Sequence, residues 1–531
     1  MKKVFSILFA LVLAVSLMIV PVVAVSAGEE AADTVYEQSI EHPRGCMFFV
    51  AGKDTSADGS VLMAYNNDYY GVNALRVEVV PRKQYKPGDT FTLMGGQEIP
   101  QPPETYSYIR LNNHLLPQPG KNEFFEGGMN EFQVGILYGT WASYLSAIEK
   151  ADPPVADGLG DEMWYLILER SRTAREGVEL FAELTNEFGV GDWLIGTFAI
   201  GDPNEVWWIE IGGGRHWVAR RVPDDAYAVA VNALQIREVD LEDTDNFMGS
   251  ADLIDFAIEV GTYDPEVHGD FDFALAYGGD AIMSGSNRNR RWAGQNMLTP
   301  SANIPLDAPY EEVDVFLAPD EGLIPQDIMK VMRDHFEGTE LDLSEGYTLG
   351  NPHFTHRPSC HRTTNYSVVW QMRDWLPDEI GGVMYVAMGS PCTSAYVPFY
   401  VGITDTPEVY QMGNAYYDPV SAFWVYREIS NLVSVNYGKA IGFAQAEWQA
   451  YEESVFAAKE EIEAAALAHY NFSPGKSSRD EQKPKGLQQV GRERARQFLT
   501  EYCFEESMRA YNIGKEIIGD LHYRIGRNYW R

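Results

Sequence analysis

The sequence predicts a fold of mixed α and β structure, with a sheet covered by helices. Short apolar runs separated by turn residues are typical of strands, and they recur at 47–50, 61–65 and between 134 and 231. A segment with helical spacing, 161–188, lies among them. The chain ends in two further helical segments, 444–470 and 486–518. This order of strands, helix and strands favours layers of both kinds.

The first two strands are predicted to form a hairpin. Apolar residues 47–50 and 61–65 flank a turn, 56–60, that has Asp58-Gly59 at its centre. Asp-Gly between two apolar runs is a strong hairpin signal. The hairpin would bring residues 65–70 back beside Cys46. Asp68 is therefore expected within a few residues of the position opposite Cys46.

The remaining elements follow from periodicity and end signals. Residues 161–188 place apolar side chains on one face of a helix that ends at Gly189, a good helix stop. The two C-terminal helices are separated by a polar break, 473–485, and are expected to cap the core. Further strands are expected at 134–138, 193–200, 206–211, 217–220, 228–231 and 382–387.

Composition bounds the class of protein. Of the 531 residues, 45% are hydrophobic and 13% aromatic, which is enough for a large core and excludes a mainly disordered chain. The formal net charge is −36. Such a surface repels phosphate backbones and anionic lipids, so we expect neither nucleic-acid binding nor membrane-surface binding.

The first 45 residues are expected to be removed. Lys2 and Lys3 precede an apolar run, 4–20, and Val25-Ser26-Ala27 supplies the small residues that signal peptidase needs. Residues 1–27 are therefore predicted to be a signal peptide, and the acidic segment 28–45 a leader. No later run reaches the ~20 apolar residues of a membrane span. The mature protein is expected to be secreted or extracytoplasmic.

Cys46 is the candidate nucleophile. Loss of the leader would give it a free α-amine, which titrates near ~8 and can accept the thiol proton. One residue would then supply both nucleophile and base. The alternative is an ordinary buried thiol, as expected for Cys360, Cys392 and Cys503.

The segment GCMFFVAGKDTSADGS at 45–60, followed by MAYNND at 63–68, resembles the opening of the C69 dipeptidase family. These are N-terminal nucleophile (Ntn) hydrolases, related to penicillin V acylase and bile salt hydrolase. The resemblance covers most of 45–440. Further matching segments lie, in the same order, at 128–131, 168–174, 208–211, 215–225, 230–232, 376–383 and 396–400.

The resemblance implies roles for individual residues. Cys46 would be the nucleophile, Asp68 would orient its amine or thiol, and Asn232 would help form the oxyanion hole, with Thr140 near a second oxyanion group. The alternatives are a solvent-facing turn carboxylate for Asp68 and a strand-end hydrogen bond for Asn232. Tyr65 departs from the family pattern, which has arginine there, and we place it among the substrate-binding candidates. Either another cation serves, or the amine acts alone, or substrate preference has shifted.

The implied fold is α+β, a four-layer αββα Ntn-hydrolase sandwich at 46–435, with a helical C-terminal region at 436–531. The implied activity is hydrolysis of short peptides without a cofactor. The alternatives are an amidase acting on N-acyl amides, or a non-enzymatic exported binding protein. Homo-oligomerisation stays open.

A cluster of His353, His356, Cys360 and His361 has ligand-like spacing, and it is the best metal candidate in the chain. The spacing matches no zinc signature, however, and the segment fits the hydrolase family, so we expect no metal.

Overall fold

The structure is a computed structural model. It describes residues 46–69, 71–114, 124–140, 142, 144–192, 194–342, 351–354, 357–471 and 485–527. The expected signal peptide, 1–27, and leader, 28–45, lie outside these residues. Residues 45–531 form one compact unit. No helix in the described ranges has both the length and the apolar character needed to cross a membrane.

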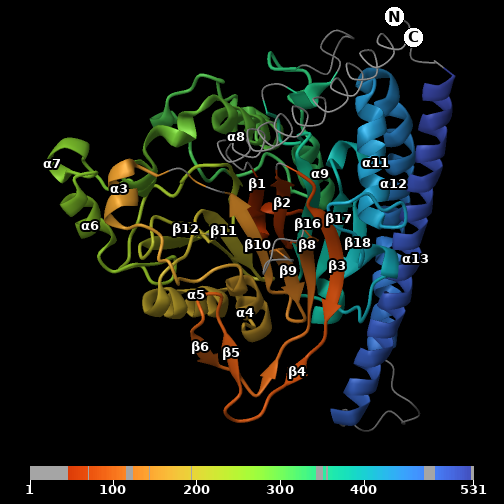
Figure 1. Ribbon diagram of the computed structural model, residues 1–531, viewed down its shortest axis with the longest axis horizontal. Helices are drawn as coiled ribbons and strands as arrows, with labels where there is room; N and C mark the ends of the chain where they lie inside the picture. The colour runs from red at the N-terminus through yellow and green to blue at the C-terminus, as the bar shows by residue number, and fades with distance from the viewer. Residues whose placement is uncertain are drawn as a thin grey trace, which may run out of the picture. The chain divides into compact units, whose positions relative to one another are not determined.

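Two antiparallel sheets form the centre of this unit (Figure 1). The first has the order β14 (Tyr227–Ala230), β1 (Met47–Ala51), β2 (Val61–Asp68), β16 (Thr364–Met372), β17 (Val383–Met388) and β18 (Val397–Tyr400). The second has the order β15 (Phe247–Gly249), β13 (Trp217–Arg221), β12 (Val206–Ile211), β11 (Thr197–Gly201), β10 (Gly135–Thr140), β9 (Phe124–Asn130), β8 (Tyr108–His114) and β3 (Ala74–Val80). Two small ribbons pair β4 (Lys83–Gln84) with β7 (Glu104–Thr105) and β5 (Thr90–Thr92) with β6 (Glu98–Pro100).

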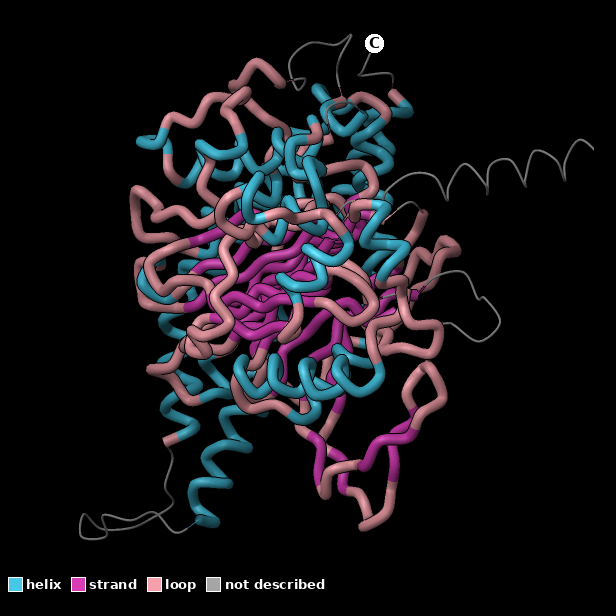
Figure 2. The backbone as a smooth tube through the Cα atoms, turned by 90° about the vertical axis from the view of Figure 1, so that its left-hand side faces the viewer, coloured by secondary structure: helices cyan, strands magenta, loops and turns pink. Residues whose placement is uncertain are grey.

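Helices cover the outer face of each sheet, and Figure 2 shows the strands in the middle with helices on either side. The first sheet is covered by α8 (Gly285–Leu298), α9 (Pro325–Arg333), α11 (Ala422–Ser434) and α13 (Lys485–Gly526). The second is covered by α4 (Glu162–Arg170) and α5 (Ala174–Phe188). The remaining helices are α3 (Ser146–Ala151), α6 (Leu253–Val260), α7 (Pro265–His268), α10 (Asp378–Gly381) and α12 (Tyr437–Tyr470). The expected four-layer αββα arrangement is confirmed.

The two sheets pack through large apolar side chains. Phe48 on β1 meets Trp208 on β12 edge to face, with ring centroids 5.4 Å apart. Trp370 on β16 donates from its indole N–H to the carbonyl of Gly128 on β9, at 3.2 Å. These side chains are buried, and burial of aromatic rings contributes strongly to the stability of such a core. Strand β1, which begins directly after Cys46, is therefore packed against the second sheet through Phe48.

The predicted hairpin is confirmed. Strands β1 and β2 pair antiparallel, with Met47 opposite Asn66. In the turn, Asp58 Oδ1 accepts hydrogen bonds from the amide and the hydroxyl of Ser60, and Gly59 has a φ of +83°. Gly52 must be glycine for another reason. A Cβ there would lie 2.3 Å from the carbonyl oxygen of Pro223.

Several expected elements differ in the structure. The helix predicted over 161–188 is two helices, because Ser171 is extended and Thr173 caps a new helix by accepting from the amide of Glu176. The strand predicted over 193–200 begins at Thr197, and Trp193 lies outside the described residues. The first C-terminal helix begins at Tyr437, seven residues earlier than expected (444 − 437).

Strand β16 was not predicted from the sequence, although it is a central strand of the first sheet. Its sequence mixes apolar residues with polar ones that are also buried. The hydroxyl of Ser367 bonds that of Tyr396 at 2.7 Å, and the side-chain Nε2 of Gln371 donates to the carboxylate of Asp58 at 2.9 Å. These partners satisfy the polar groups, so the strand shows no alternation of apolar and polar residues.

Candidate active site

The Cys46 thiol lies at the start of β1, against the end of β2. The hydroxyl of Tyr65 donates to Cys46 Sγ at 3.0 Å, and the backbone N–H of Asp68 lies 3.4 Å from the same sulfur. Both are donors, and donors favour a charged thiolate over a neutral thiol. The Tyr65 hydroxyl also accepts from Asn67 Nδ2 at 3.2 Å. Tyr65 is fully buried, and its polar end faces the sulfur.

The Asp68 side chain is buried, which excludes a solvent-facing turn carboxylate. Its Oδ1 accepts from the hydroxyl of Thr364 at 2.5 Å, and its Oδ2 lies 3.7 Å from the guanidinium of Arg357. Burial raises the pKa of Asp68 to about 6, although Arg357, Thr364 and Arg290 oppose the rise. Arg357 has a φ of +44°, which is uncommon for a residue with a side chain and is often found at functional sites.

Arg290 connects Cys46 to Asn232. It is fully buried on α8, where Nη1 donates to the carbonyl oxygen of Cys46 at 2.9 Å and Nη2 donates to Asn232 Oδ1 at 2.8 Å. Asn287 supports the same arrangement, because its Nδ2 donates to the carbonyl of Asn232 at 3.0 Å. Burial lowers the pKa of Arg290 to about 9. Because Asn232 Oδ1 faces the Arg290 guanidinium, the Nδ2 donor of Asn232 is on the side of the carboxamide away from Arg290.

The loop that carries Asn232 is fixed by Glu210 on β12. Both carboxylate oxygens of Glu210 accept from the amide of Gln235, at 2.8 and 3.0 Å, and Oε2 also accepts from the amide of Ile236 at 3.0 Å. Gln235 in turn accepts from the amide of Val231 at 2.7 Å. Glu210 is fully buried, and burial raises its pKa to about 8.

The other candidates from the sequence are placed as follows. Thr140 ends β10 and pairs with Thr197, but its side chain lies outside what the structure describes. All four cysteines are buried free thiols, as expected for Cys360, Cys392 and Cys503. The imidazole of His361 bonds the hydroxyl of Thr363 at 2.9 Å.

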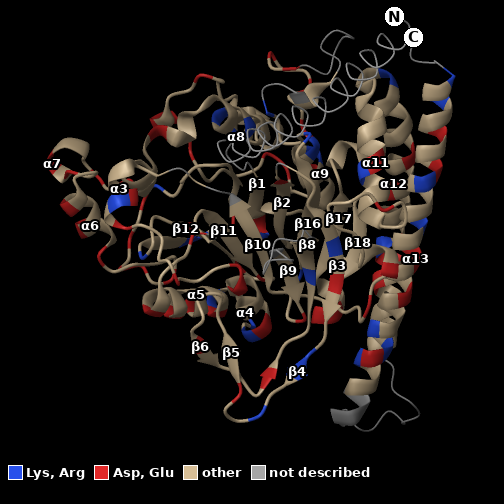
Figure 3. Ribbon diagram, viewed as in Figure 1, with Lys and Arg blue, Asp and Glu red and all other residues tan. Residues whose placement is uncertain are grey.

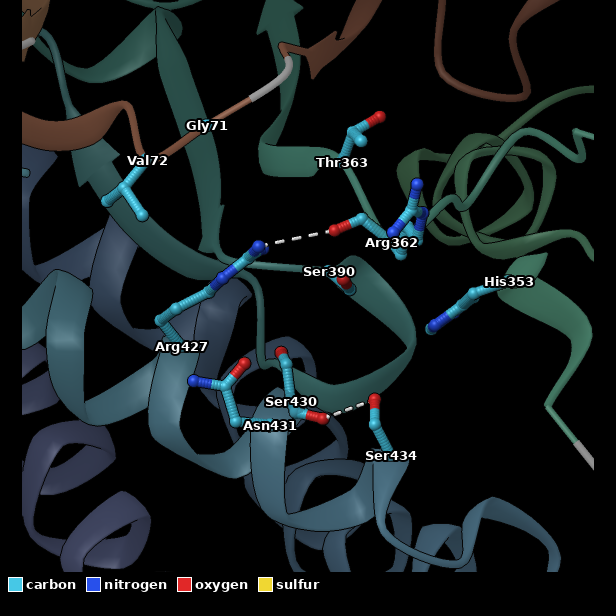
Figure 4. A pocket seen from close by; sticks show the side chains of 10 residues that line it. All are labelled: Gly71, Val72, His353, Arg362, Thr363, Ser390, Arg427, Ser430, Asn431 and Ser434. Carbon is cyan, nitrogen blue, oxygen red and sulfur yellow. Dashed lines mark hydrogen bonds between the residues drawn. The ribbon is translucent and has the colours of Figure 1, made fainter. Parts of the chain in front are cut away.

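A cavity of about 390 Å³ is lined in part by Thr363, the residue that precedes Thr364 in the sequence. The carbonyl of Thr363 in its wall accepts from the amide of Tyr69 at 3.0 Å, and the neighbouring Thr364 holds Asp68. Figure 4 shows the guanidinium groups of Arg362 and Arg427 in the lining, on opposite sides of Ser390. The residues that line it are Gly71, Val72, His353, Arg362, Thr363, Ser390, Arg427, Ser430, Asn431 and Ser434.

Sequence reasoning did not find Arg290, Arg357 or Thr364. Arg290 lies 244 residues from Cys46, and Arg357 and Thr364 lie 289 and 296 residues from Asp68. One signal was available. Because arginine is rarely buried, RNRR at 288–291 within an otherwise uncharged stretch could have marked a site.

The geometry brings together the parts of a nucleophilic amide-hydrolysing site. A thiol lies beside two donors, a buried carboxylate lies on the neighbouring strand, and a guanidinium links the carbonyl of Cys46 to a carboxamide. Such groups can stabilise a thiolate and a developing oxyanion. Of the explanations for tyrosine at position 65, the structure favours another cation, because the Arg290 guanidinium lies at the carbonyl of Cys46.

Comparisons with known proteins place the chain in a family. The sequence model of peptidase family C69 matches residues 45–450. A probable dipeptidase B from Streptococcus pyogenes serotype M1 is 31% identical over 411 residues, covering 75% of this chain and 80% of the relative. A probable dipeptidase from Latilactobacillus sakei is 30% identical over 401 residues, covering 74% and 82%. A solved mutant of the conjugated bile acid hydrolase from Clostridium perfringens is 12% identical with a TM-score of 0.24, covering 65% of this chain and 89% of that one.

Proposed function

The chain belongs to peptidase family C69 and is a peptide-bond hydrolase, and from this premise we propose that it is an exported dipeptidase whose nucleophile is Cys46. One observation carries the assignment of the nucleophile. The Cys46 thiol receives hydrogen bonds from the Tyr65 hydroxyl and the Asp68 backbone amide, and Arg290 joins the Cys46 carbonyl to the Asn232 carboxamide, so that residues far apart in sequence meet at one place.

Activation requires a cut between Gly45 and Cys46. The freed α-amine of Cys46 then accepts the thiol proton, and Sγ attacks the scissile carbonyl carbon. Tyr65 and the Asp68 amide stabilise the thiolate before attack. Asn232 Nδ2 donates to the oxyanion as it forms, because Arg290 holds the Oδ1 atom on the other side. Arg290 supplies positive charge at the nucleophile.

Collapse of the tetrahedral intermediate breaks the carbon–nitrogen bond. The protonated α-amine gives its proton to the leaving amine, which departs and leaves a thioester on Cys46. The amine then deprotonates a water, which attacks the thioester, and the acid is released. Asp68 holds the amine in place through both steps, and Arg357 and Thr364 hold Asp68.

The relatives and the cavity support a substrate class. Relatives named as probable dipeptidases match over most of their length. In the cavity, Arg362 and Arg427 complement the carboxylate of a short peptide with a free C-terminus, because guanidinium groups bind carboxylates well. We therefore propose that this end of a dipeptide binds there.

Two experiments test the function. Purified enzyme is assayed on free dipeptides, dipeptide amides and N-acyl amino acids, and hydrolysis of free dipeptides is expected to be fastest. Activity on the N-acyl amides alone would contradict the assignment. Cys46→Ala is expected to lose activity, whereas Cys503→Ala on α13 retains it. An Arg427→Gln variant is expected to raise KM for free dipeptides more than for the amides.

The proposal also includes export and maturation. Intact mass is measured on protein recovered from the culture medium or envelope. A chain that starts at Cys46 is expected. Active protein in which Gly45 still precedes Cys46 would contradict the role of the α-amine.

A further inference from the structure

A second cluster of nucleophilic side chains is present, and the hydrolytic mechanism does not use it. It consists of His335, His353, Cys360 and Cys392, and all four are buried. They come from four segments. His335 follows α9, His353 lies in the short helix η6 (Pro352–Phe354), Cys360 precedes β16, and Cys392 lies in the short helix η7 (Pro391–Thr393).

The distances in this cluster are close to those of a tetrahedral metal site. His353 Nε2 lies 3.0 Å from His335 Nε2, 3.3 Å from Cys392 Sγ and 3.6 Å from Cys360 Sγ. All four ligand atoms lie within 4.8 Å of one another. Around a zinc ion with Zn–S bonds of about 2.3 Å and Zn–N bonds of about 2.0–2.1 Å, tetrahedral ligand atoms are about 3.3–3.8 Å apart.

A carboxylate orients one of the imidazoles. Glu337 Oε1 lies 2.8 Å from Nδ1 of His335, and Oε2 accepts from the His335 amide at 2.7 Å. Because an ionised carboxylate can only accept, Nδ1 carries a proton, and Nε2 is the nitrogen that faces the cluster and would bind a metal when the ring is neutral. A histidine whose other nitrogen donates to a carboxylate is typical of zinc sites.

We propose that His335, His353, Cys360 and Cys392 bind one zinc ion in a closed structural site. Two thiolates and two imidazoles suit zinc and do not suit Mg²⁺ or Ca²⁺, which prefer oxygen ligands. As the Zn–S bonds form, each thiol releases its proton to solvent, and both histidines bind as neutral rings. Two thiolates neutralise the charge of Zn²⁺, which makes the site compatible with burial.

The site would hold the groups that orient Asp68. Cys360 lies between Arg357 and Thr364, and the amide of Cys360 donates to the carbonyl of Asp334 at 3.1 Å. On β2, Asn66 Nδ2 donates to the carbonyls of both Met332 and Ser359, at 2.9 and 2.8 Å. The zinc ion would therefore tie the end of α9, the loop before β16 and η7 together beside the strand that carries Asp68.

Local spacing pointed to part of this set only. Of the cluster noted in the sequence, His353 and Cys360 belong to it, His361 is bonded to Thr363, and His356 lies outside the described residues. His335 and Cys392 come from distant segments. The expectation that the chain needs no metal is therefore replaced by this proposal.

The test measures metal directly. The full chain is purified without chelators, and its metal content is determined by mass spectrometry. About one zinc per chain is expected. Replacement with Co²⁺ should give the visible absorption of a tetrahedral site with thiolate-to-metal charge transfer. Removal of the metal is expected to lower the midpoint of thermal unfolding by more than about 5 °C, and one equivalent of Zn²⁺ should restore it.

Variants identify the ligands. Cys392→Ala and Cys360→Ala are expected to reduce bound zinc at least tenfold, whereas Cys503→Ala and Cys46→Ala keep it. The measurements on the unaltered chain decide the matter if these variants do not fold. The proposal is wrong if that chain contains no transition metal and takes up neither Zn²⁺ nor Co²⁺, or if peptide mapping of the chain as isolated shows a Cys360–Cys392 disulfide. It does not depend on which bond Cys46 attacks.

Discussion

At the scale of single residues, the chemistry at Cys46 depends on how the thiol is made nucleophilic. Tyr65 supplies a hydrogen bond of 3.0 Å to Sγ without a charge, and Arg290 supplies a charge through the Cys46 carbonyl without a bond to the sulfur. Thiolate formation benefits from both, because donors and nearby cations favour the charged form. The two functions that one arginine could combine are divided here between two side chains.

A Tyr65→Phe substitution tests the first of these functions. The ring and its packing remain, and only the donor to Sγ is lost. The pKa of the Cys46 thiol is expected to rise by about 1 unit, and kcat/KM at pH 7 to fall about tenfold. The pH dependence of thiol alkylation measures the pKa. Tyr385→Phe on β17, whose hydroxyl faces Gln371, is the control. An unchanged alkylation profile in Tyr65→Phe would show that the hydroxyl is not needed.

Titration of the Asp68 carboxylate is expected to give an acid limb, a fall of kcat/KM toward low pH. Its pKa is about 6, so the carboxylate is charged above that pH and is neutralised as the pH falls through it. A neutral Asp68 no longer holds the ammonium form of the Cys46 amine. We therefore expect kcat/KM to fall below about pH 6.

A Thr364→Val substitution should move this limb to higher pH, because the Thr364 hydroxyl favours the charged form of Asp68. Initial rates measured from pH 4.5 to 9 give the profile. Thr185→Val on α5 is the control and should leave the limb in place. A limb that does not move in Thr364→Val would mean that another group titrates there.

The sequence pointed to Cys46, Asp68 and Asn232 as candidates, because hairpin signals and family resemblance are carried by short stretches. It did not reveal the partners that position them. Thr364 lies 296 residues from Asp68, and a hydrogen bond across that separation leaves no local pattern. Tyr65 was identified as a departure from the family, but only the structure shows its hydroxyl at the sulfur.

At the scale of elements, β12 and the loop after β14 form a unit that presents Asn232. The backbone N–H groups of Gln235 and Ile236 donate to the side chain of Glu210, and not to the carbonyls of a neighbouring strand. Burial raises the pKa of Glu210 to about 8, far above the value of an exposed glutamate. The folded chain therefore keeps a proton on Glu210 over a pH range in which the unfolded chain has lost it.

The sign of the effect on stability follows. Between about pH 4.5 and 8 the folded state binds more protons at Glu210 than the unfolded state, so the free energy of unfolding falls as the pH rises. In Glu210→Gln the side chain cannot ionise, and this contribution is lost. Relative to the natural chain, the variant should gain about 3 kcal/mol between pH 5.5 and 8.5.

Urea unfolding at the two pH values measures this difference. Glu179→Gln, an exposed position on α5, is the control and should unfold in parallel with the natural chain. If the free energy of unfolding of Glu210→Gln also changes with pH in parallel with that of the natural chain, the Glu210 carboxyl is ionised at its usual pH in the folded state.

Elements were predictable where their pattern is local. The hairpin, β12 and β13 follow from apolar runs between turn residues. Strand β16 does not, because Ser367 and Gln371 are buried with distant partners, and a pattern of buried polar residues does not resemble a strand. The break between α4 and α5 depends on one capping side chain, Thr173, within a run whose apolar spacing continues.

At the scale of the whole molecule, the C-terminal helices pack against the part of the core that contains the first sheet. Helix α13 packs along β18, and α12 contacts η7, where the indole of Trp448 donates to the carbonyl of Thr393 at 2.8 Å. Acidic and basic residues are interspersed along α13 (Figure 3). Helical periodicity predicted both helices, but which strand they cover depends on tertiary contacts that the sequence does not show.

One buried ion pair joins α12 to the core. The guanidinium of Arg373, which directly follows β16, lies 2.7 Å from Glu463 on α12 and donates to the carbonyls of Gly381 and Ile380. Its side chain is 3% exposed. A buried charge that loses its partner destabilises a fold much more than a surface charge does. This pair therefore makes α12 part of the folding unit of the sheets.

A Glu463→Ala substitution tests that conclusion. The free energy of unfolding is expected to fall by about 3 kcal/mol, because Arg373 stays buried without its carboxylate. Urea unfolding is followed by tryptophan fluorescence and, separately, by far-ultraviolet circular dichroism. Glu461→Ala, an exposed position two residues away, should change the stability by less than about 0.5 kcal/mol. If α12 belongs to the core, the two signals shift together in Glu463→Ala. Loss of helical signal at a lower urea concentration than the fluorescence change would mean that α12 unfolds independently of the sheets.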